Sequence, residues 1–168
     1  MRNSGVKLLS LLSFSVLTAC SHNNIKPEDN IHAACAAKKV TTINGQPVPG
    51  ELMRLQDNSE MLDTIDSEGK RLIITKGTRK AGTRVGIHIH KYGGHTCVLS
   101  GAIVDFVEGQ KGKKRKDGGM EFKAGSCYYM PPNTYMSAAN LGEEDAVLID
   151  TFNLPVGEDP ISICEPGY

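Results

Sequence analysis

The sequence predicts one all-β domain, a sandwich or a jelly-roll barrel, behind an export signal. The chain has 168 residues, which suits a single domain. It contains 18 Gly, 8 Pro and no Trp, and this composition favours many short strands joined by tight turns over long helices. Short apolar and β-branched runs recur along it, separated by turn residues such as those at 93–94 and 131–132.

Nine runs are expected to form strands. They are residues 40–43, 52–55, 71–75, 83–89, 96–99, 102–107, 127–130, 135–138 and 146–152. Within the fourth run, polar and apolar residues alternate, so that Ile87 and Ile89 share one face of a strand and His88 and His90 share the other.

The N-terminus has the pattern of an export signal. Arg2 and Lys7 precede a ten-residue apolar stretch, residues 8–17, which is too short to span a bilayer. Leu-Thr-Ala-Cys follows directly and resembles the lipobox of bacterial lipoproteins, in which the Cys20 thiol receives diacylglycerol and the new amino end is acylated, with palmitate for example. Ser21 after the cysteine favours the outer membrane under the enterobacterial sorting rule. The alternative is an ordinary secretory signal with a chance cysteine.

These features divide the chain into three parts. Residues 1–19 are the expected signal peptide, 20–38 the lipidated cysteine and its tether, and 39–168 the folded domain. The 19 basic residues balance the 19 acidic ones, so no nucleic-acid partner is expected. The expected location is the bacterial cell envelope, at the outer membrane facing the periplasm. The expected partners are the membrane, through the lipid, and a small-molecule ligand, with a homodimer as the candidate assembly.

Four cysteines follow the lipidated one: Cys35, Cys97, Cys127 and Cys164. An even number in an exported protein predicts disulfides, since the periplasm is oxidising. Free thiols are the alternative, and a cysteine metal site is disfavoured because no C-x-x-C pair is present.

Three histidines form the candidate metal site. His88 and His90 lie two residues apart, which on a strand puts both rings on one face, about 6.6 Å apart along the backbone. His95, expected on the next strand, could supply a third nitrogen. Three neutral imidazoles suit Fe, Ni, Zn or Cu. The alternative is a metal-free pocket in which these rings only form hydrogen bonds.

The same segment resembles the first motif of the cupin superfamily: Gly, five residues, His-x-His, three or four residues, Glu, six residues, Gly. The matching residues are Gly82, His88, His90 and Gly101. With four residues between it and His90, His95 stands where the Glu would fall. Counting back from Gly101 instead puts Gly94 there. His95 is the expected replacement for the acidic ligand.

The second cupin motif, Gly, five residues, Pro-x-Gly, two residues, His, three residues, Asn, is matched at Gly125, Pro131 and Asn140. Asn133 replaces the motif Gly, which is reasonable because Asn tolerates left-handed backbone geometry. Met136 replaces the ligand His.

The resemblance covers about residues 50–157 and implies a cupin-type jelly-roll β-barrel. It implies a metal site of His88, His90, His95 and Met136, although a buried Met can simply fill space. Two classes of function stay open. One is a metal-dependent oxygenase, isomerase or lyase acting on a small molecule. The other is a ligand-binding, sensor or assembly protein with a vestigial site.

Tyr128 and Tyr129 are the candidate catalytic residues, because strand alternation turns one of them inward, where a phenol could position a substrate or act as an acid. Packing is the alternative role. Asp105 and Glu121 are further acids without a motif role.

The cupin topology also implies the disulfide pairing. It pairs the strand starting near His95 with the strand before Pro131, which brings Cys97 opposite Cys127. Cys35 and Cys164 lie just outside the two ends of the domain, and chain ends are often close together, so they would form the second bridge.

Overall fold

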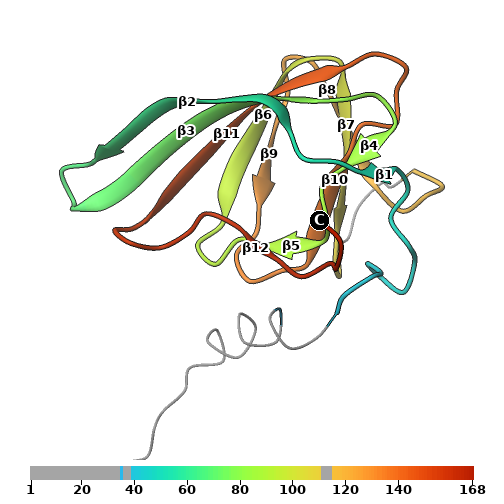
Figure 1. Cartoon of the computed structure of the whole chain (residues 1–168), viewed down its shortest axis with the longest axis horizontal. Coiled ribbons are helices and arrows are strands. Elements are labelled where there is room, and N and C mark those ends of the chain that lie inside the picture. Colours follow the sequence, from blue (N-terminus) through green and yellow to red (C-terminus); the bar gives the residue numbers. More distant parts are fainter. Residues whose placement is uncertain (1–34, 36–38, 111–114) are drawn as a thin grey trace, which may run out of the picture.

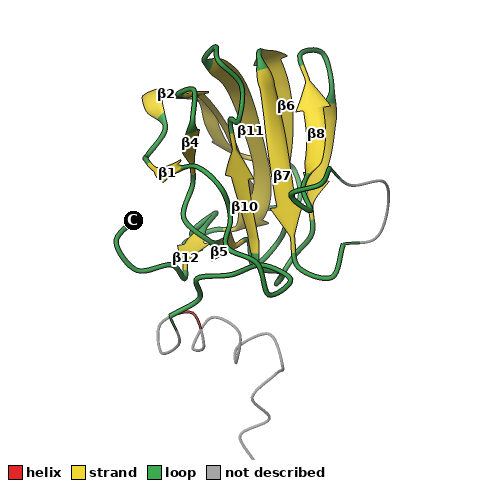
Figure 2. Cartoon of the chain, turned by 90° about the vertical axis from the view of Figure 1, so that its right-hand side faces the viewer, coloured by secondary structure: helices red, strands yellow, loops and turns green. Residues whose placement is uncertain are grey.

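The computed structural model describes Cys35, residues 39–110 and residues 115–168. Its named elements are twelve β-strands in two sheets that face each other (Figures 1 and 2). The seven-stranded sheet has the order β1 (Glu51–Leu52), β4 (Thr83–Arg84), β10 (Met136–Ala139), β5 (His88–Ile89) and β12 (Ser162–Ile163), with β7 (Ala102–Val107) paired to β10 and to β8 (Met120–Lys123). The five-stranded sheet has the order β2 (Gln56–Ile65), β3 (Lys70–Arg79), β11 (Ala146–Pro155), β6 (Gly94–Ser100) and β9 (Cys127–Met130).

Strands far apart in the sequence lie next to each other in both sheets. β11 pairs antiparallel with β3 on one side and with β6 on the other, and β10 pairs antiparallel with β4, β5 and β7. This is the jelly-roll arrangement that the resemblance to cupins implies. The all-β fold class expected from the sequence is confirmed.

The main core fills the space between the two sheets. Strand side chains alternate between faces, so each strand contributes every second residue to it. Its buried members are Ile73, Val98, Ile103, Val107, Tyr128, Met130, Met136, Ala146, Leu148, Phe152 and Leu154. A second cluster lies on the other face of the seven-stranded sheet, where Ile43 and Val48 cover Ile87 and Ala139. The central strands of that sheet, β4, β5, β7 and β10, are therefore largely buried on both faces.

Several predicted strands differ in extent from the observed ones. β1 contains only Leu52 of the run 52–55, and β3 continues four residues beyond the run 71–75. Residues 40–43 form no named strand, because Asn44 and Gly45 have positive φ and make a tight turn that leaves a single bridge between Ile43 and Gln46. Residues 83–89 are divided into β4 and β5. At the break, the Ile87 amide donates to the Glu165 carboxylate (2.8 Å) instead of to a neighbouring strand.

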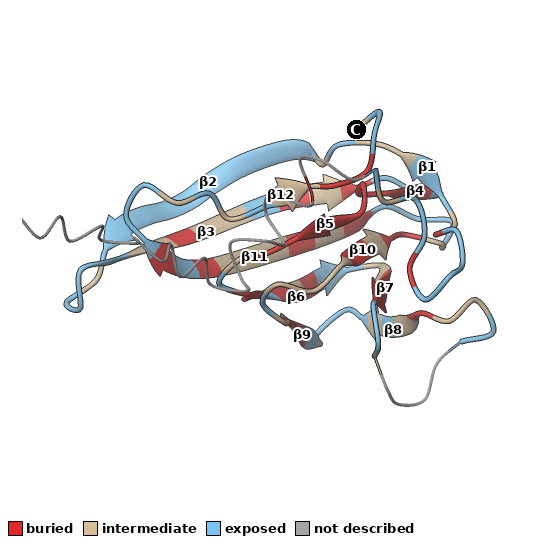
Figure 3. Ribbon diagram, turned by 90° about the horizontal axis from the view of Figure 1, so that it is seen from below, coloured by how far each residue is buried: buried red, intermediate tan, exposed pale blue. Residues whose placement is uncertain are grey.

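Three strands were not predicted: β2, β8 and β12. The largest omission is β2, a ten-residue edge strand that is exposed along its whole length (Figure 3). It is rich in polar residues and lacks the apolar alternation by which a half-buried strand is detected.

The turn of the second motif has the predicted geometry. Asn133 has a φ of 52°, the left-handed conformation that the motif Gly would adopt, and its amide donates to the His90 carbonyl (2.9 Å). The two motifs thus meet at the mouth of the barrel.

Both cysteine pairs expected from the topology are brought together. Cys97 and Cys127 are direct partners across β6 and β9, with their Cα atoms 4.0 Å apart and their sulfur atoms joined. Cys35 and Cys164 are joined as well, with Cα atoms 4.5 Å apart. No helix in the described part of the chain is long and apolar enough to cross a membrane.

Candidate functional site

A cavity of about 380 Å³ lies between the two sheets. Sites for small molecules occupy roughly 300–1,000 Å³, so the cavity could hold a compact organic molecule. Much of its wall is apolar, but ten polar side chains also line it: Arg54, Asn58, Thr75, Arg79, His88, His90, Thr96, Tyr128, Asp150 and Tyr168.

His88 and His90 lie side by side on the inner face of the seven-stranded sheet, as the alternation predicted. They are 4% and 2% exposed, and both line the cavity. His88 Nδ1 lies 2.8 Å from the Gly86 carbonyl oxygen, and His90 Nδ1 lies 2.6 Å from the Pro160 carbonyl oxygen. A carbonyl oxygen can only accept, so each Nδ1 carries a proton and donates it.

The two remaining ring nitrogens face each other, with 3.1 Å between His88 Nε2 and His90 Nε2. Burial, together with the neighbouring His90, lowers the pKa of His88 to about 3, and burial lowers the pKa of His90 to about 4. Both rings are therefore neutral near pH 7. With the protons on Nδ1, two lone pairs point at one another, and a cation between them would relieve their repulsion.

The spacing suits two ligands of one metal ion. With metal–nitrogen bonds of about 2.0–2.1 Å, a nitrogen separation of 3.1 Å corresponds to an angle of about 98° at the metal. The backbone acceptors at Nδ1 fix the ring orientation in the manner of outer-shell partners in metal sites. The pair therefore fits two positions of a divalent transition-metal site.

The prediction that His95 supplies the third metal ligand is wrong. His95 is exposed on the outer face of β6, where its ring packs on that of Tyr129, with the centroids 5.2 Å apart. Strand alternation explains the placement, because Gly94 and Thr96 are the residues of this stretch that face inward. The Glu position of the motif therefore falls on Gly94.

Phe152 occupies the space that a side chain at position 94 would need. A Cβ built on Gly94 would lie 2.7 Å from Phe152 Cδ1, which is far inside van der Waals contact. The Phe152 ring also packs on that of His90, with the centroids 5.1 Å apart. An apolar ring thus stands beside His90 where the resemblance implies a carboxylate ligand.

Met136 lies within the barrel. It is 1% exposed, belongs to the main core and is the direct partner of His88 across β10 and β5. Among the residues that the structure describes, no three His, Cys, Asp or Glu side chains are placed to hold a metal together. The described residues thus bring two imidazoles together, whereas Met136 packs in the core and does not line the cavity.

The two candidate tyrosines point in opposite directions. Tyr128 is 7% exposed, faces inward and lines the cavity, whereas Tyr129 is 55% exposed and lies outside. Burial raises the pKa of Tyr128 well above its ordinary value, with the Asp105 and Asp150 carboxyl groups as further causes. Tyr128 therefore stays a neutral hydroxyl, and Tyr129 is not a residue of the cavity.

Asp150 and Thr96 belong to the cavity but were not among the predicted site residues. Thr96 Oγ1 donates to Asp150 Oδ1 (2.5 Å), and burial raises the pKa of Asp150. The alternation of β11 could have revealed this acid, because Asp150 lies midway between Leu148 and Phe152, both of which face the core. Glu121, by contrast, pairs with Arg115 on the surface.

The end of the chain closes one side of the cavity. Pro160, Ile163 and Tyr168 line it. Glu165 fixes this segment by accepting from two nitrogens of Arg84, at 2.5 and 2.7 Å. The segment therefore both orients His90, through the Pro160 carbonyl, and covers the site.

No family model matches the sequence, and no curated protein matches it significantly. Solved structures are similar to it. An uncharacterized conserved protein with a double-stranded β-helix domain from Klebsiella pneumoniae is 19% identical, over 78% of this chain and 94% of that chain, with a TM-score of 0.47. A cupin-like protein from Thermotoga maritima is 13% identical, over 70% and 99%, with a TM-score of 0.49. An RmlC-like cupin from Shewanella frigidimarina is 17% identical, over 71% and 95%, with a TM-score of 0.48.

Proposed function

We propose that this protein is an exported, lipid-anchored protein with a cupin fold that binds a small molecule in the cavity between its sheets, beside a divalent metal held by His88 and His90. The observation that carries the proposal is the pair of Nε2 atoms 3.1 Å apart, while both Nδ1 atoms are engaged by backbone carbonyls. In this arrangement the lone pairs of the two Nε2 atoms repel each other, and a cation bound between them would remove that repulsion.

The protein supplies only part of the metal coordination, so the bound small molecule or water would complete it. The resemblance implies four protein ligands, but Gly94 and Met136 occupy two of those positions, and neither offers nitrogen or carboxylate oxygen. Water or oxygen atoms of the bound molecule would complete the coordination. Imidazole suits Fe, Ni, Zn and Cu alike. When bound, such a metal would polarise an oxygen of the small molecule as a Lewis acid.

Binding is favoured over catalysis because half of the implied ligand set is missing. One observation supports a metal-dependent enzyme as the second candidate. Asp150 lines the cavity and burial raises its pKa, which moves the group toward the range in which a carboxyl can transfer protons near neutral pH. Thr96 holds this carboxyl in place with its hydroxyl.

Export and anchoring are supported by the residues of the N-terminus and by the cysteines. The Leu-Thr-Ala-Cys sequence ending at Cys20 resembles a lipobox. All four other cysteines are paired in the structure, which suits an oxidising compartment such as the periplasm. Both features support a protein of the bacterial envelope, and Ser21 after the cysteine favours the outer membrane.

Metal titration tests the proposal. Protein purified with a chelator and then dialysed is titrated with Ni²⁺, Zn²⁺ and Cu²⁺ in a calorimeter. The wild type should bind one ion per chain, and His88→Ala and His90→Ala should each abolish binding, because either change leaves a single imidazole.

His95→Ala is the matched control, since it removes an exposed imidazole from the neighbouring strand and should leave the affinity unchanged. A wild type that binds no metal, or binding that depends on His95 and not on His88, would overturn the metal site.

A further inference from the structure

Arg79 is a buried cation for which the fold provides no partner carboxylate. It lies at the end of β3, is 3% exposed and lines the cavity. Its Nη1 donates to the Met53 carbonyl, but its Nε has no hydrogen-bond partner and, in the described part of the chain, no acidic side chain forms an ion pair with it. Guanidinium groups stay protonated at every physiological pH.

Burying an unpaired charge is costly, and buried charges in proteins are normally paired or bind an ion. The contrast within this molecule is clear, because the other buried arginine, Arg84, is paired through two nitrogens with Glu165. The charge of Arg79 acts within the cavity, since it lowers the pKa of His88, Tyr128 and Asp150, in each case as a lesser cause than burial.

We propose that the small molecule bound in the cavity carries a carboxylate group and that Arg79 is the residue that selects it. This inference rests on the proposed small-molecule function and names the chemical class of the ligand. The planar guanidinium matches a carboxylate in shape and charge. Asp150 does not already play this role, because its carboxyl is bonded to Thr96 and is not within ion-pair distance of Arg79.

The apolar lining and the volume of the cavity indicate what the ligand contains besides its carboxylate. Ile73, Leu148 and Phe152 are among the apolar residues that line it, and they suit a hydrocarbon body. The volume of about 380 Å³ is near the lower limit of small-molecule sites, which start at roughly 300 Å³. A short carboxylic acid with an apolar body therefore fits the site better than a sugar or a nucleotide.

Matched pairs of probes test the inference on chelator-treated protein. Benzoate, phenylacetate and hexanoate are each titrated against their primary amides, which have nearly the same shape but no charge. The wild type should bind each carboxylate at least about tenfold more tightly than its amide, as expected for a hydrogen bond between buried charged groups. Arg79→Met should remove this preference.

Lys76→Met is the control, because Lys76 lies on the same strand as Arg79 but is exposed and does not line the cavity. This variant should keep the preference. Equal binding of acids and amides by the wild type, or a preference that survives Arg79→Met, would overturn the carboxylate inference and leave the small-molecule function standing. A wild type that binds none of the six probes would overturn both. The wild-type comparison decides the matter even if Arg79→Met fails to fold.

Discussion

Asp105 allows a direct test of the polar interior through the dependence of stability on pH. It is 2% exposed on β7, between Val104 and Phe106, which pack in the outer cluster, so its side chain turns toward the core. Burial raises its pKa from 3.8 to about 7. Between these two values the folded protein binds a proton that the unfolded chain releases. The stabilisation is therefore complete below pH 4 and is lost as the pH rises through 7.

The size of the effect follows from the shift. Each pKa unit corresponds to about 1.4 kcal/mol, so the rise from 3.8 to about 7 costs the folded state about 4 kcal/mol at alkaline pH. Asp105→Asn replaces the acid by a neutral group of the same shape. The variant should match the wild type near pH 4 and have a higher free energy of unfolding at pH 8, by up to that amount.

Urea unfolding with the disulfides intact measures this difference. The chain has no Trp, so far-UV circular dichroism is the appropriate signal. His88 and His90 act in the opposite direction, because their lowered pKa values remove stability as the pH falls below 6.5. Subtracting the wild-type curve from the variant curve cancels their contribution.

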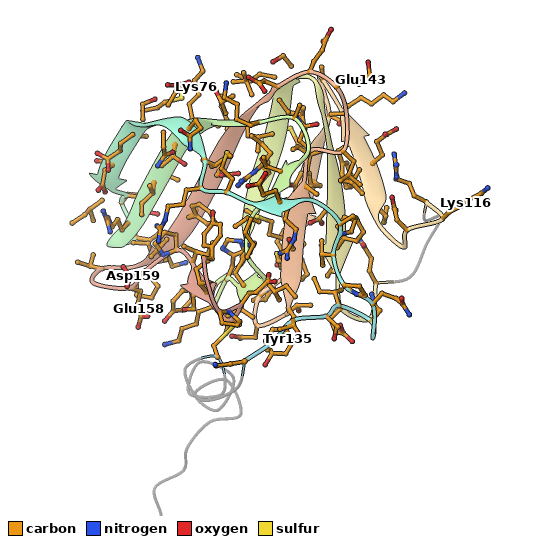
Figure 4. The ribbon with its side chains drawn as sticks, turned by 45° about the vertical axis from the view of Figure 1, so that its right-hand side comes forward. Lys76, Lys116, Tyr135, Glu143, Glu158 and Asp159 are labelled. Carbon is orange, nitrogen blue, oxygen red and sulfur yellow. A yellow bond between two sulfur atoms is a disulfide. The ribbon has the colours of Figure 1, made fainter. Side chains whose placement is uncertain are left out.

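Asp159→Asn is the control, since Asp159 is exposed on the loop between β11 and β12, beside Glu158 (Figure 4). As a substitution on the surface, it should change the free energy of unfolding by less than about 0.5 kcal/mol. A flat curve for Asp105→Asn, or a variant less stable than the wild type at pH 8, would refute the burial of a protonated carboxyl.

Three further predictions concern the site, the disulfide and the anchor. Gly94→Ala should cost about 1–3 kcal/mol by overpacking against Phe152, and less in a Phe152→Ala background, so a double-mutant cycle that gave additive costs would contradict the contact. Replacing Cys97 and Cys127 together by Ala should lower the free energy of unfolding by about 3–4 kcal/mol, because the bridge closes a 30-residue separation, and an unchanged urea midpoint would argue against the bond. Cys20→Ser should release the protein from the membrane fraction or leave it unprocessed, whereas wild-type partitioning and migration would exclude lipidation.

The alternation of side chains along strands predicted much of the site. It placed His88 and His90 on one face and required one of two adjacent tyrosines to point inward, and both predictions need only the period of two. The pairing of Cys97 with Cys127 needed in addition the strand order that the resemblance to cupins implies. The left-handed geometry at Asn133 was predictable from the resemblance, because Asn133 stands at the Gly position of the second motif and Asn tolerates that geometry.

The same rule shows why His95 was misplaced. Spacing within a motif was counted from His90 across the loop at 91–93, where a strand's period of two does not apply. Counting back from Gly101 along the strand gives Gly94 as the inward residue, and the structure agrees. The loss of the acidic ligand was therefore visible in the sequence, but the filling of its space by Phe152, more than fifty residues later, was not.

Arg79 could not be found from the sequence, because its role depends on what is absent around it. The predicted strand ended at residue 75, whereas β3 continues to Arg79. An arginine at a strand end is usually solvated, and only the three-dimensional structure shows that this one is enclosed without a carboxylate partner.

In the proposed lipid-anchored protein, the bond between Cys35 and Cys164 would limit the distance between the cavity and the membrane. If Cys20 carries lipid, only fifteen residues of chain run from the bilayer to Cys35, and a fully extended chain of that length reaches about 50 Å. Without the bond, the tether would extend to the first strand and would therefore be longer. With the bond, the tether joins the domain at Cys35, next to the segment that covers the site. Such a protein would sample the molecules that pass within the reach of this tether from the membrane surface.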